Sequence, residues 1–320
     1  MIKQPEDAKN VIPMRRGLNL RPQVWTVASG KGGVGKTFIT SSFGITLAKL
    51  GHSVLLLDLD FTGANLHTAL GLKPSHLSIR QFFEGEKKIS ECIVPTQIPH
   101  LSYVQGIWDS WSPIALASEQ IYKIVEEVHQ LKYDYVIIDV GPGATLENLI
   151  LFQMADEKVL ITTPEPTSIE KSYRFIEYYL CTTLKEGSDT EAYSHLIQNL
   201  REYRQRLLNE PFSIKEFVKR NEGISQRAYA KLVEKPPRLV VNGVRTQTAK
   251  TLGHSMRSVC HKFYDLDIHY LGGIDFDNAV WQSAKSREPV LLSQPFTPLA
   301  GQFLSMCKHL IDPTDLRAVV

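Results

Sequence analysis

Cysteine is scarce in this chain of 320 residues, and its four copies lie far apart, at Cys92, Cys181, Cys260 and Cys307. None of them forms a C-x-x-C pair with another. The spacing therefore argues against a disulfide framework and against a zinc knuckle. Scattered thiols of this kind are typical of proteins kept in a reducing cytoplasm.

Long apolar runs are also missing. No segment approaches the ~20 apolar residues that span a membrane, and the first residues lack the apolar stretch of a signal peptide. Arg15 and Arg16 are followed by Gly-Leu-Asn-Leu-Arg-Pro, which interrupts any twin-arginine signal. The formal net charge of +2 gives no sign of an obligatory nucleic-acid or anionic-membrane partner. We expect a cytoplasmic protein, with peripheral contact at the inner membrane left open.

The chain does contain a glycine-rich segment, 29–37, that matches the phosphate-loop pattern G-x-x-x-x-G-K-[ST]. The apolar run 24–28 before it predicts a buried strand, and 37–50 after it predicts a helix that ends at Gly51. Glycines let successive backbone N–H groups wrap a phosphate chain at the positive end of a helix. Lys36 would reach the β- and γ-phosphates, and the Thr37 hydroxyl would bind Mg²⁺. The predicted nucleotide-binding residues of the loop are Gly30, Lys31, Gly32, Gly33, Val34, Gly35, Lys36 and Thr37.

Short apolar strands alternate with helical patterns along the rest of the chain. This alternation predicts an α/β fold with a mostly parallel twisted sheet and helices on both faces. Ligands of such sheets bind beyond the carboxyl ends of the strands. We expect a P-loop NTPase domain over 23–311, a flexible N-terminal arm over 1–22 and a C-terminal tail over 312–320. The further predicted strands are 54–58, 101–105, 135–139, 158–163, 238–242 and 268–271.

Residues 181–237 break this alternation and predict a helical insertion. Two capping boxes, Ser188 with Glu191 and Ser213 with Glu216, would open its helices. The insertion is either a packed spacer or a surface that docks a partner. The apolar helix faces would be Leu196, Leu200, Tyr203 and Leu207 in the first helix, and Phe212, Phe217 and Val218 in the second.

Carboxylates follow two of the predicted strands downstream of the loop. Asp58 and Asp60 stand at alternate positions, so their side chains leave the same side of the strand end. Asp139 ends an apolar run and is followed by a turn that begins at Gly141. A nucleoside triphosphatase needs groups that anchor Mg²⁺ and place a water molecule. Asp139 is therefore expected to hold the hydration shell of Mg²⁺, and the Gly141 N–H to face the γ-phosphate.

These residues resemble the MinD/ParA branch of P-loop ATPases, which carries a deviant Walker A motif. Segment 31–37 matches its K-G-G-x-G-K-[ST] signature, and 58–66 is similar to its first switch segment. Within the branch, the FlhG/FleN group of flagellar-number regulators is the nearest, on the strength of 139–143, 162–168 and 270–274. The resemblance covers about 23–180 and 238–311.

The resemblance implies a mechanism for these positions. Lys31 would be the signature lysine that crosses into the partner subunit when two ATP-loaded monomers pair, as an arginine finger does. Asp60 would orient the attacking water, while Asp58 and Asp139 would anchor Mg²⁺ through water. Asn242 would recognise adenine, which favours ATP. The family thus implies ATP and Mg²⁺ as cofactors, slow hydrolysis, an ATP-dependent homodimer and use as a switch. The expected catalytic residues are Lys31, Lys36, Asp60 and Asp139, and the expected metal residues are Thr37, Asp58 and Asp139.

Three features depart from the family pattern. After Thr167-Ser-Ile-Glu170, relatives commonly place an aspartate that contacts the opposing signature lysine, but this chain has Lys171. Glu170 either substitutes for that aspartate or caps its own helix with Thr167. The helix 298–311 has an apolar face but only two basic candidates, so packing on the sheet is expected in place of membrane binding. Residues 5–10 only faintly match the N-terminal motif by which the flagellar group activates a GTPase.

The leading interpretation is an ATP-driven switch that places or numbers a cellular structure: flagella, a chemoreceptor array, a chromosome or the division site. The expected protein partner is a polar landmark, a GTPase of the signal-recognition-particle type or a transcriptional regulator. One alternative is an iron–sulfur carrier or metabolic enzyme with the same loop, which would need closely placed cysteines. Another is a regulator of a transcription factor whose ATPase activity is incidental. The basic clusters are interleaved with acids and give no strong nucleic-acid signal; they are Arg201, Arg204 and Arg206, and Lys219 and Arg220.

Overall fold

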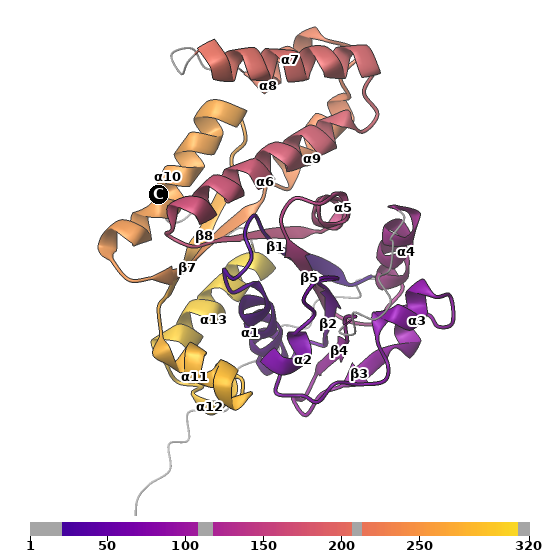
Figure 1. Cartoon of the computed structure of the whole chain (residues 1–320), viewed down its shortest axis with the longest axis vertical. Helices are drawn as coiled ribbons and strands as arrows, with labels where there is room; N and C mark the ends of the chain where they lie inside the picture. The colour runs from indigo at the N-terminus through magenta and orange to yellow at the C-terminus, as the bar shows by residue number, and fades with distance from the viewer. Residues whose placement is uncertain (1–20, 108–117, 207–212, 313–320) are drawn as a thin grey trace, which may run out of the picture.

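The computed structural model describes residues 21–107, 118–206 and 213–312, except for the side chains of 204–206 (Figure 1). The predicted arm 1–22 and tail 312–320 lie almost wholly outside these residues, as do Leu207, Phe212 and the side chains of Arg204 and Arg206. Within the described chain, no helix has both the length and the apolar character needed to cross a membrane.

Every strand predicted from the sequence is present, and one short strand was not predicted. The strands are β1 (Gln23–Ser29), β2 (Val54–Leu59), β3 (Ile93–Pro95), β4 (Leu101–Val104), β5 (Tyr135–Pro142), β6 (Glu157–Thr162), β7 (Arg238–Val244) and β8 (His269–Asp275). They form one sheet in the order β3-β4-β2-β5-β1-β6-β7-β8. All neighbouring pairs are parallel except β3 with β4. The prediction of a mostly parallel α/β fold is therefore confirmed.

Helices cover both faces of the sheet (Figure 1). Outside the insertion they are α1 (Lys36–Lys49), α2 (Leu66–Ala69), α3 (Ile79–Phe83), the 3-10 helix η1 (Ile89–Glu91), α4 (Ser118–His129), α5 (Leu146–Met154), α6 (Pro166–Lys185), α10 (Gln247–Tyr264), α11 (Asn278–Ser286), α12 (Val290–Ser293) and α13 (Pro298–Ile311). Side chains alternate between the two faces along each strand. In β1, Val24 and Ala28 join a core with α4, α5, α6 and α10, whereas Trp25 and Val27 join a core with α1 and α13. Each face of the sheet thus has its own apolar core.

The last helix, α13, packs on the sheet as predicted. Its apolar face contacts α1 and β8, and the four side chains on that face are 3% exposed or less: Leu299, Phe303, Met306 and Leu310. Because this face is already buried, α13 has no free apolar stripe for a membrane.

The predicted insertion 181–237 is helical. It holds α7 (Thr190–Arg206), α8 (Ile214–Arg220) and α9 (Gln226–Glu234), while its first residues continue α6 to Lys185. Figure 1 shows α7 and α8 at one end of the molecule, beyond α6 and α9. Leu196 and Val218 are fully buried, and both belong to the same apolar core as α6. The insertion is therefore packed onto the domain through its predicted apolar faces.

Of the two predicted capping boxes, one is wrong and the other is present only in its serine half. Ser213 does cap α8, since its hydroxyl accepts the Glu216 N–H at 3.1 Å. Ser188, however, lies two residues before α7 begins at Thr190. Its hydroxyl donates to the Leu184 carbonyl and accepts the Ser225 N–H, so it joins the end of α6 to the start of α9.

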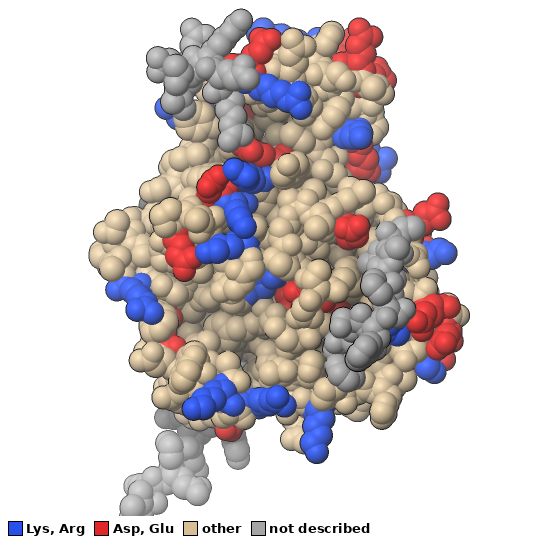
Figure 2. All heavy atoms as spheres, viewed as in Figure 1, with Lys and Arg blue, Asp and Glu red and all other residues tan. Residues whose placement is uncertain are grey.

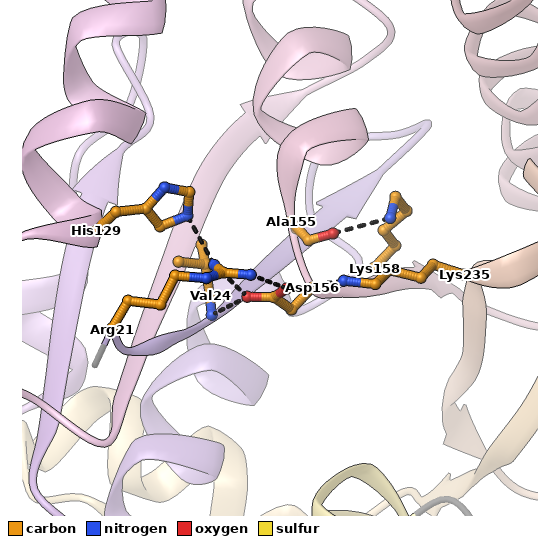
Figure 3. Close-up of polar contacts among 7 residues, drawn as sticks. All are labelled: Arg21, Val24, His129, Ala155, Asp156, Lys158 and Lys235. Atoms are coloured by element: carbon orange, nitrogen blue, oxygen red, sulfur yellow. Dashed lines mark hydrogen bonds and ion pairs between the residues drawn. The ribbon is translucent and has the colours of Figure 1, made fainter. Parts of the chain in front are cut away.

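A buried carboxylate, Asp156, joins several segments at the end of the sheet where β1 and β6 begin (Figure 3). Asp156, with a side chain only 7% exposed, accepts two hydrogen bonds from Arg21 and one each from Lys235 and the Val24 N–H. Burial alone would raise the pKa of Asp156, but these donors outweigh it and lower the pKa. The neighbouring Lys158 donates to the Ala155 carbonyl, and burial lowers its pKa to about 8. Asp156 therefore joins the start of β1 to the end of the insertion.

Candidate nucleotide-binding site

The predicted phosphate loop joins the end of β1 to the start of α1. Gly33 and Gly35 have φ angles of 78° and 93°, in the left-handed region that favours glycine. Gly35 is the N-cap of α1 and provides no side chain to cap it. The first N–H groups of α1 are therefore open to an anion at the positive end of the helix. Lys36 follows at once, with its side chain only 7% exposed.

Two glycines of the loop are required by close neighbours. A Cβ at Gly30 would lie 2.2 Å from the Lys171 carbonyl oxygen in α6. A Cβ at Gly35 would lie 2.4 Å from the amide nitrogen of Asn242, which donates to the Val34 carbonyl at 2.8 Å. The structure thus brings Asn242, at the end of β7, against the loop, and its role with adenine stays a prediction.

A hollow of about 510 Å³ opens beyond the ends of β7 and β8, close in sequence to Asn242. It is lined by Val244, Arg245, Thr246, Gln247, Lys250, Asp275 and Phe276. The Arg245 guanidinium lies 3.6 Å from the centre of the Phe276 ring, which is 45% exposed. A flat base can stack against such a pair. Neither residue is predicted from the sequence, because a lone Arg or Phe after a strand carries no motif.

The two predicted metal-anchoring carboxylates lie opposite each other. Asp58 in β2 and Asp139 in β5 are register partners, and each is 1% exposed. Asp58 accepts the N–H groups of Asp60 and Leu66 at 3.2 and 3.0 Å. Asp139 accepts the Thr40 hydroxyl on one oxygen at 3.3 Å. Its other oxygen is buried without a hydrogen-bond partner among the described residues.

The surroundings disfavour two negative charges here. Burial raises the pKa of Asp58, and repulsion by Asp139 raises it further. Burial also raises the pKa of Asp139, although Lys36 and the Thr37 hydroxyl lower it in part. A divalent cation would remove this penalty, and oxygen ligands of this kind suit Mg²⁺. The residues present therefore fit a magnesium site, and the buried Asp139 oxygen without a hydrogen-bond partner is the strongest sign of it.

Asp60, the predicted water-orienting residue, is held by its own loop. One carboxylate oxygen accepts the N–H groups of Thr62 and Gly63, both at 3.0 Å, and the Thr62 hydroxyl at 2.8 Å. A Cβ at Gly141 would lie 3.3 Å from the same oxygen. Asp60 and Gly141, predicted to share the γ-phosphate end of the site, are thus brought together.

Asn148, which is not predicted from the sequence, fixes the turn after β5. Its side-chain amide donates to the Gly141 carbonyl at 3.0 Å and to the Gly143 carbonyl at 2.9 Å. The only signal in the sequence was a polar residue in the first turn of a helix that is otherwise largely apolar. By holding these two carbonyls, the amide fixes the backbone of the turn that follows Gly141.

Lys31 is held within its own chain. Its amine donates to the Glu165 carboxylate at 2.6 Å and to the Thr167 hydroxyl at 3.0 Å, both at the start of α6. Glu170 pairs with Arg174 one turn further on, and the N-cap of α6 is Glu165. The proposed capping box of Thr167 with Glu170 is therefore absent.

A family model and several known proteins are similar to this chain. A family model named ParA, described as an NUBPL iron-transfer P-loop NTPase, matches residues 22–187. The septum site-determining protein MinD of a Synechocystis species is 31% identical over 198 residues, which cover 61% of this chain and 71% of that protein. The flagellum site-determining protein YlxH of Helicobacter pylori is 33% identical over 155 residues, 47% of this chain and 51% of that protein. Among solved structures, MinD of Pyrococcus horikoshii complexed with Mg-ADP superposes with a TM-score of 0.63 at 19% identity, over 93% of this chain and 100% of that one.

Proposed function

Because this chain belongs to the ParA/MinD family of P-loop NTPases, we propose that it binds and slowly hydrolyses Mg-ATP as a switch that places or numbers a cellular structure. The observation that carries the proposal is one site: an open α1 N-terminus with buried Lys36, facing the Asp58–Asp139 pair and its unpartnered oxygen. The names of MinD and YlxH, septum and flagellum site determination, favour the division site or the flagellum as the structure concerned.

In this proposal each residue of the site has a chemical task. The loop N–H groups and Lys36 bind the phosphates and offset their charge. Thr37, Asp58 and Asp139 would hold Mg²⁺, which supplies positive charge at the β- and γ-phosphate oxygens when bound. Asp60 would orient water once its carboxylate leaves the N–H groups of Thr62 and Gly63. Such a rearrangement before each turnover is consistent with slow hydrolysis.

Lys31 would supply a charge to the nucleotide of a second subunit. To do so it must leave Glu165 and Thr167, which hold it in the single chain. Lys171, one turn beyond Thr167, is exposed and adds a positive charge where relatives commonly place an aspartate. Dimerisation with ATP is therefore proposed to be weaker here than in relatives that carry the acid.

Two variants test the proposal. Lys36→Ala is expected to abolish ATP binding in calorimetry, because it removes the cation that offsets the phosphates. Asp60→Ala should still bind ATP but lose turnover by about a hundredfold, as expected for the loss of a water-orienting group. In light scattering with ATP, Asp60→Ala should accumulate as a dimer. If the wild-type chain neither binds ATP nor releases phosphate, the proposal fails.

The cysteines of the described chain give no support to the alternative of an iron–sulfur carrier. Cys92, Cys260 and Cys307 are buried and Cys181 is partly buried. In the part of the chain that the structure describes, no group of three or more His, Cys, Asp or Glu side chains is placed to hold a metal.

The basic pair Lys219 and Arg220 in α8 forms ion pairs with Glu216, at 3.3 and 3.9 Å. That pairing favours a solvated helix face and gives no support to nucleic-acid binding.

A further inference from the structure

The segment that follows β2 holds the Asp60 carboxylate in one orientation. One oxygen of Asp60 accepts the Thr62 hydroxyl at 2.8 Å, and it also accepts the N–H groups of Thr62 and Gly63 at 3.0 Å. Two of these donors are backbone groups, but the third belongs to the Thr62 side chain alone. Thr62 and Gly63 are exposed, so core packing does not require a hydroxyl here. We refer to these three hydrogen bonds as the Asp60 lock.

The backbone that carries the Asp60 lock is tethered to its surroundings. The ring of Phe61, the residue between Asp60 and Thr62, lies 5.6 Å from the ring of Phe83 at the end of α3, in an edge-to-face arrangement. Such aromatic pairs stabilise the contact beyond the area that they bury. Both rings are partly buried and pack against the core on that face of the sheet. The position of Phe83 therefore restrains the residues on either side of Phe61.

The locked orientation is not the one that hydrolysis needs. A group that orients water accepts a hydrogen bond from it, but three donors already share this oxygen, which has about two lone-pair sites. A Cβ at Gly141 would lie 3.3 Å from the same oxygen, so rotation of the Asp60 carboxylate is enough, without movement of β2. Asp60 is partly exposed. Figure 2 shows acidic side chains recessed in the middle of the face it draws, where β2 and β5 lie in Figure 1.

We infer that Thr62 is a positioning residue for the hydrolysis, and that its hydroxyl, with the contact between Phe61 and Phe83, keeps Asp60 in a resting orientation and slows each turnover. The inference rests on the proposed role of Asp60. It gives the substitutions a definite sign, because removal of the hydroxyl or of the Phe83 ring should speed the reaction. A purely structural role for these side chains would give a slower enzyme in each case.

Thr62→Val tests the hydroxyl, because valine has nearly the same shape and no donor. Its kcat for ATP should rise about fivefold, on the scale of one exposed hydrogen bond. The KM should stay within about twofold, since the hydroxyl does not contact the nucleotide in this proposal. Thr62→Ser keeps the hydroxyl and should keep the wild-type kcat. Thr251→Val removes an exposed hydroxyl in α10 that donates to the Thr248 carbonyl, and should change nothing.

A kcat that is unchanged or lower in Thr62→Val overturns the inference. A double variant then shows whether Thr62 acts through Asp60. The chain with Asp60→Ala and Thr62→Val should hydrolyse ATP no faster than Asp60→Ala alone, because no carboxylate is left to release. The same fold increase in this background would mean that Thr62 acts on another group, which contradicts the assignment.

Phe83 tests the tether. Phe83→Leu keeps an apolar side chain but loses the ring, so kcat should rise about threefold, on the scale of one edge-to-face pair. Phe83→Tyr keeps the ring and should keep the wild-type rate. Phe82→Leu removes the neighbouring ring of the same helix, and its effect should be smaller. Equal effects of Phe82→Leu and Phe83→Leu would indicate a general loosening of α3 and would remove Phe83 from the assignment.

Hydrogen exchange tests the lock without reference to ATP. In the nucleotide-free chain, mass spectrometry of peptides that cover 59–66 should show exchange about threefold faster or more in Thr62→Val and Phe83→Leu. Thr62→Ser should exchange as the wild type does. Exchange that is equal in all four proteins overturns the inference, even if ATP turnover is normal. Faster exchange in a chain that hydrolyses no ATP would instead reject the proposed function and leave the lock itself in place.

Discussion

Asp58 and Asp139 lie opposite each other with almost no access to water, and this geometry couples metal binding to stability. Because each pKa is raised in the folded chain, the folded state keeps a proton at a pH where the unfolded chain has lost it. The free energy of unfolding of the metal-free protein should therefore fall as pH rises from about 5 to about 8. Mg-ATP should reverse this loss, since it binds the charged pair in the folded state only.

Asp139→Asn tests this coupling. The amide can still accept the Thr40 hydroxyl on its oxygen, but the repulsion within the pair is gone. At pH 8 in EDTA, the variant should be more stable than the wild type by about 1–2 kcal/mol in urea unfolding. Its stability should vary less with pH, and its ATPase activity should be lost. A variant less stable than the wild type at pH 8 would show that the two carboxylates do not oppose each other's ionisation.

Asp156 behaves in the opposite way, because its pKa is lowered by its donors. Its contribution to stability is complete above the pKa of an unfolded aspartate, about 4, and is lost as pH falls below that value. Asp156→Asn should cost about 2–3 kcal/mol at pH 7, since Arg21, Lys235 and the Val24 N–H lose a buried charged acceptor. The loss should shrink near pH 3 in urea unfolding.

Asp267→Asn is the matched control for Asp156→Asn. Asp267 also binds an arginine, Arg257 at 2.9 Å, but the two side chains are 52% and 49% exposed. An exposed pair of this kind contributes about 0.2–1 kcal/mol. If the two substitutions cost the same, Asp156 does not hold β1 and the insertion together in the way the contacts indicate.

The elements that sequence patterns predicted well are those that the chain forms locally. β1, β2 and β5 each contain an apolar run followed by a polar residue, Ser29, Asp58 or Asp139, and the phosphate loop is a fixed motif of consecutive residues. β3 has only the three residues Ile-Val-Pro, too few for a pattern to appear. The cap of α7 was misplaced because the Ser188 hydroxyl bonds to Ser225, 37 residues away, which no local rule includes.

In the candidate site, too, the residues that follow local patterns were predicted, and the contacts between residues far apart in the sequence were not. Asp58, Asp60 and Asp139 follow recognisable strands, so their convergence followed from the parallel topology. The partners of Lys31 could not be predicted in this way, because Glu165 and Thr167 are 134 and 136 residues away from it. A sequence pattern marks a lysine that can act on another subunit, but only the fold shows what holds it in its own.

At the scale of the whole molecule, the contact between Lys31 and Glu165 affects dimerisation. Lys31 and Glu165 are 30% and 62% exposed, so their ion pair contributes about 0.2–1 kcal/mol, up to about a fivefold effect on an equilibrium. If the pair restrains Lys31 in the monomer, Glu165→Gln should strengthen ATP-dependent dimerisation by about two- to fivefold in sedimentation equilibrium. Glu186→Gln, which breaks an exposed pair with Lys231 at the far end of α6 and leaves Lys31 alone, should change it little. A weaker dimer in Glu165→Gln would mean that Glu165 instead receives the lysine of the opposing subunit, in place of the aspartate that Lys171 replaces. The same measurement on Lys171→Asp then distinguishes the two arrangements, because a restored acid should rescue the dimer only if an acid is needed across the interface.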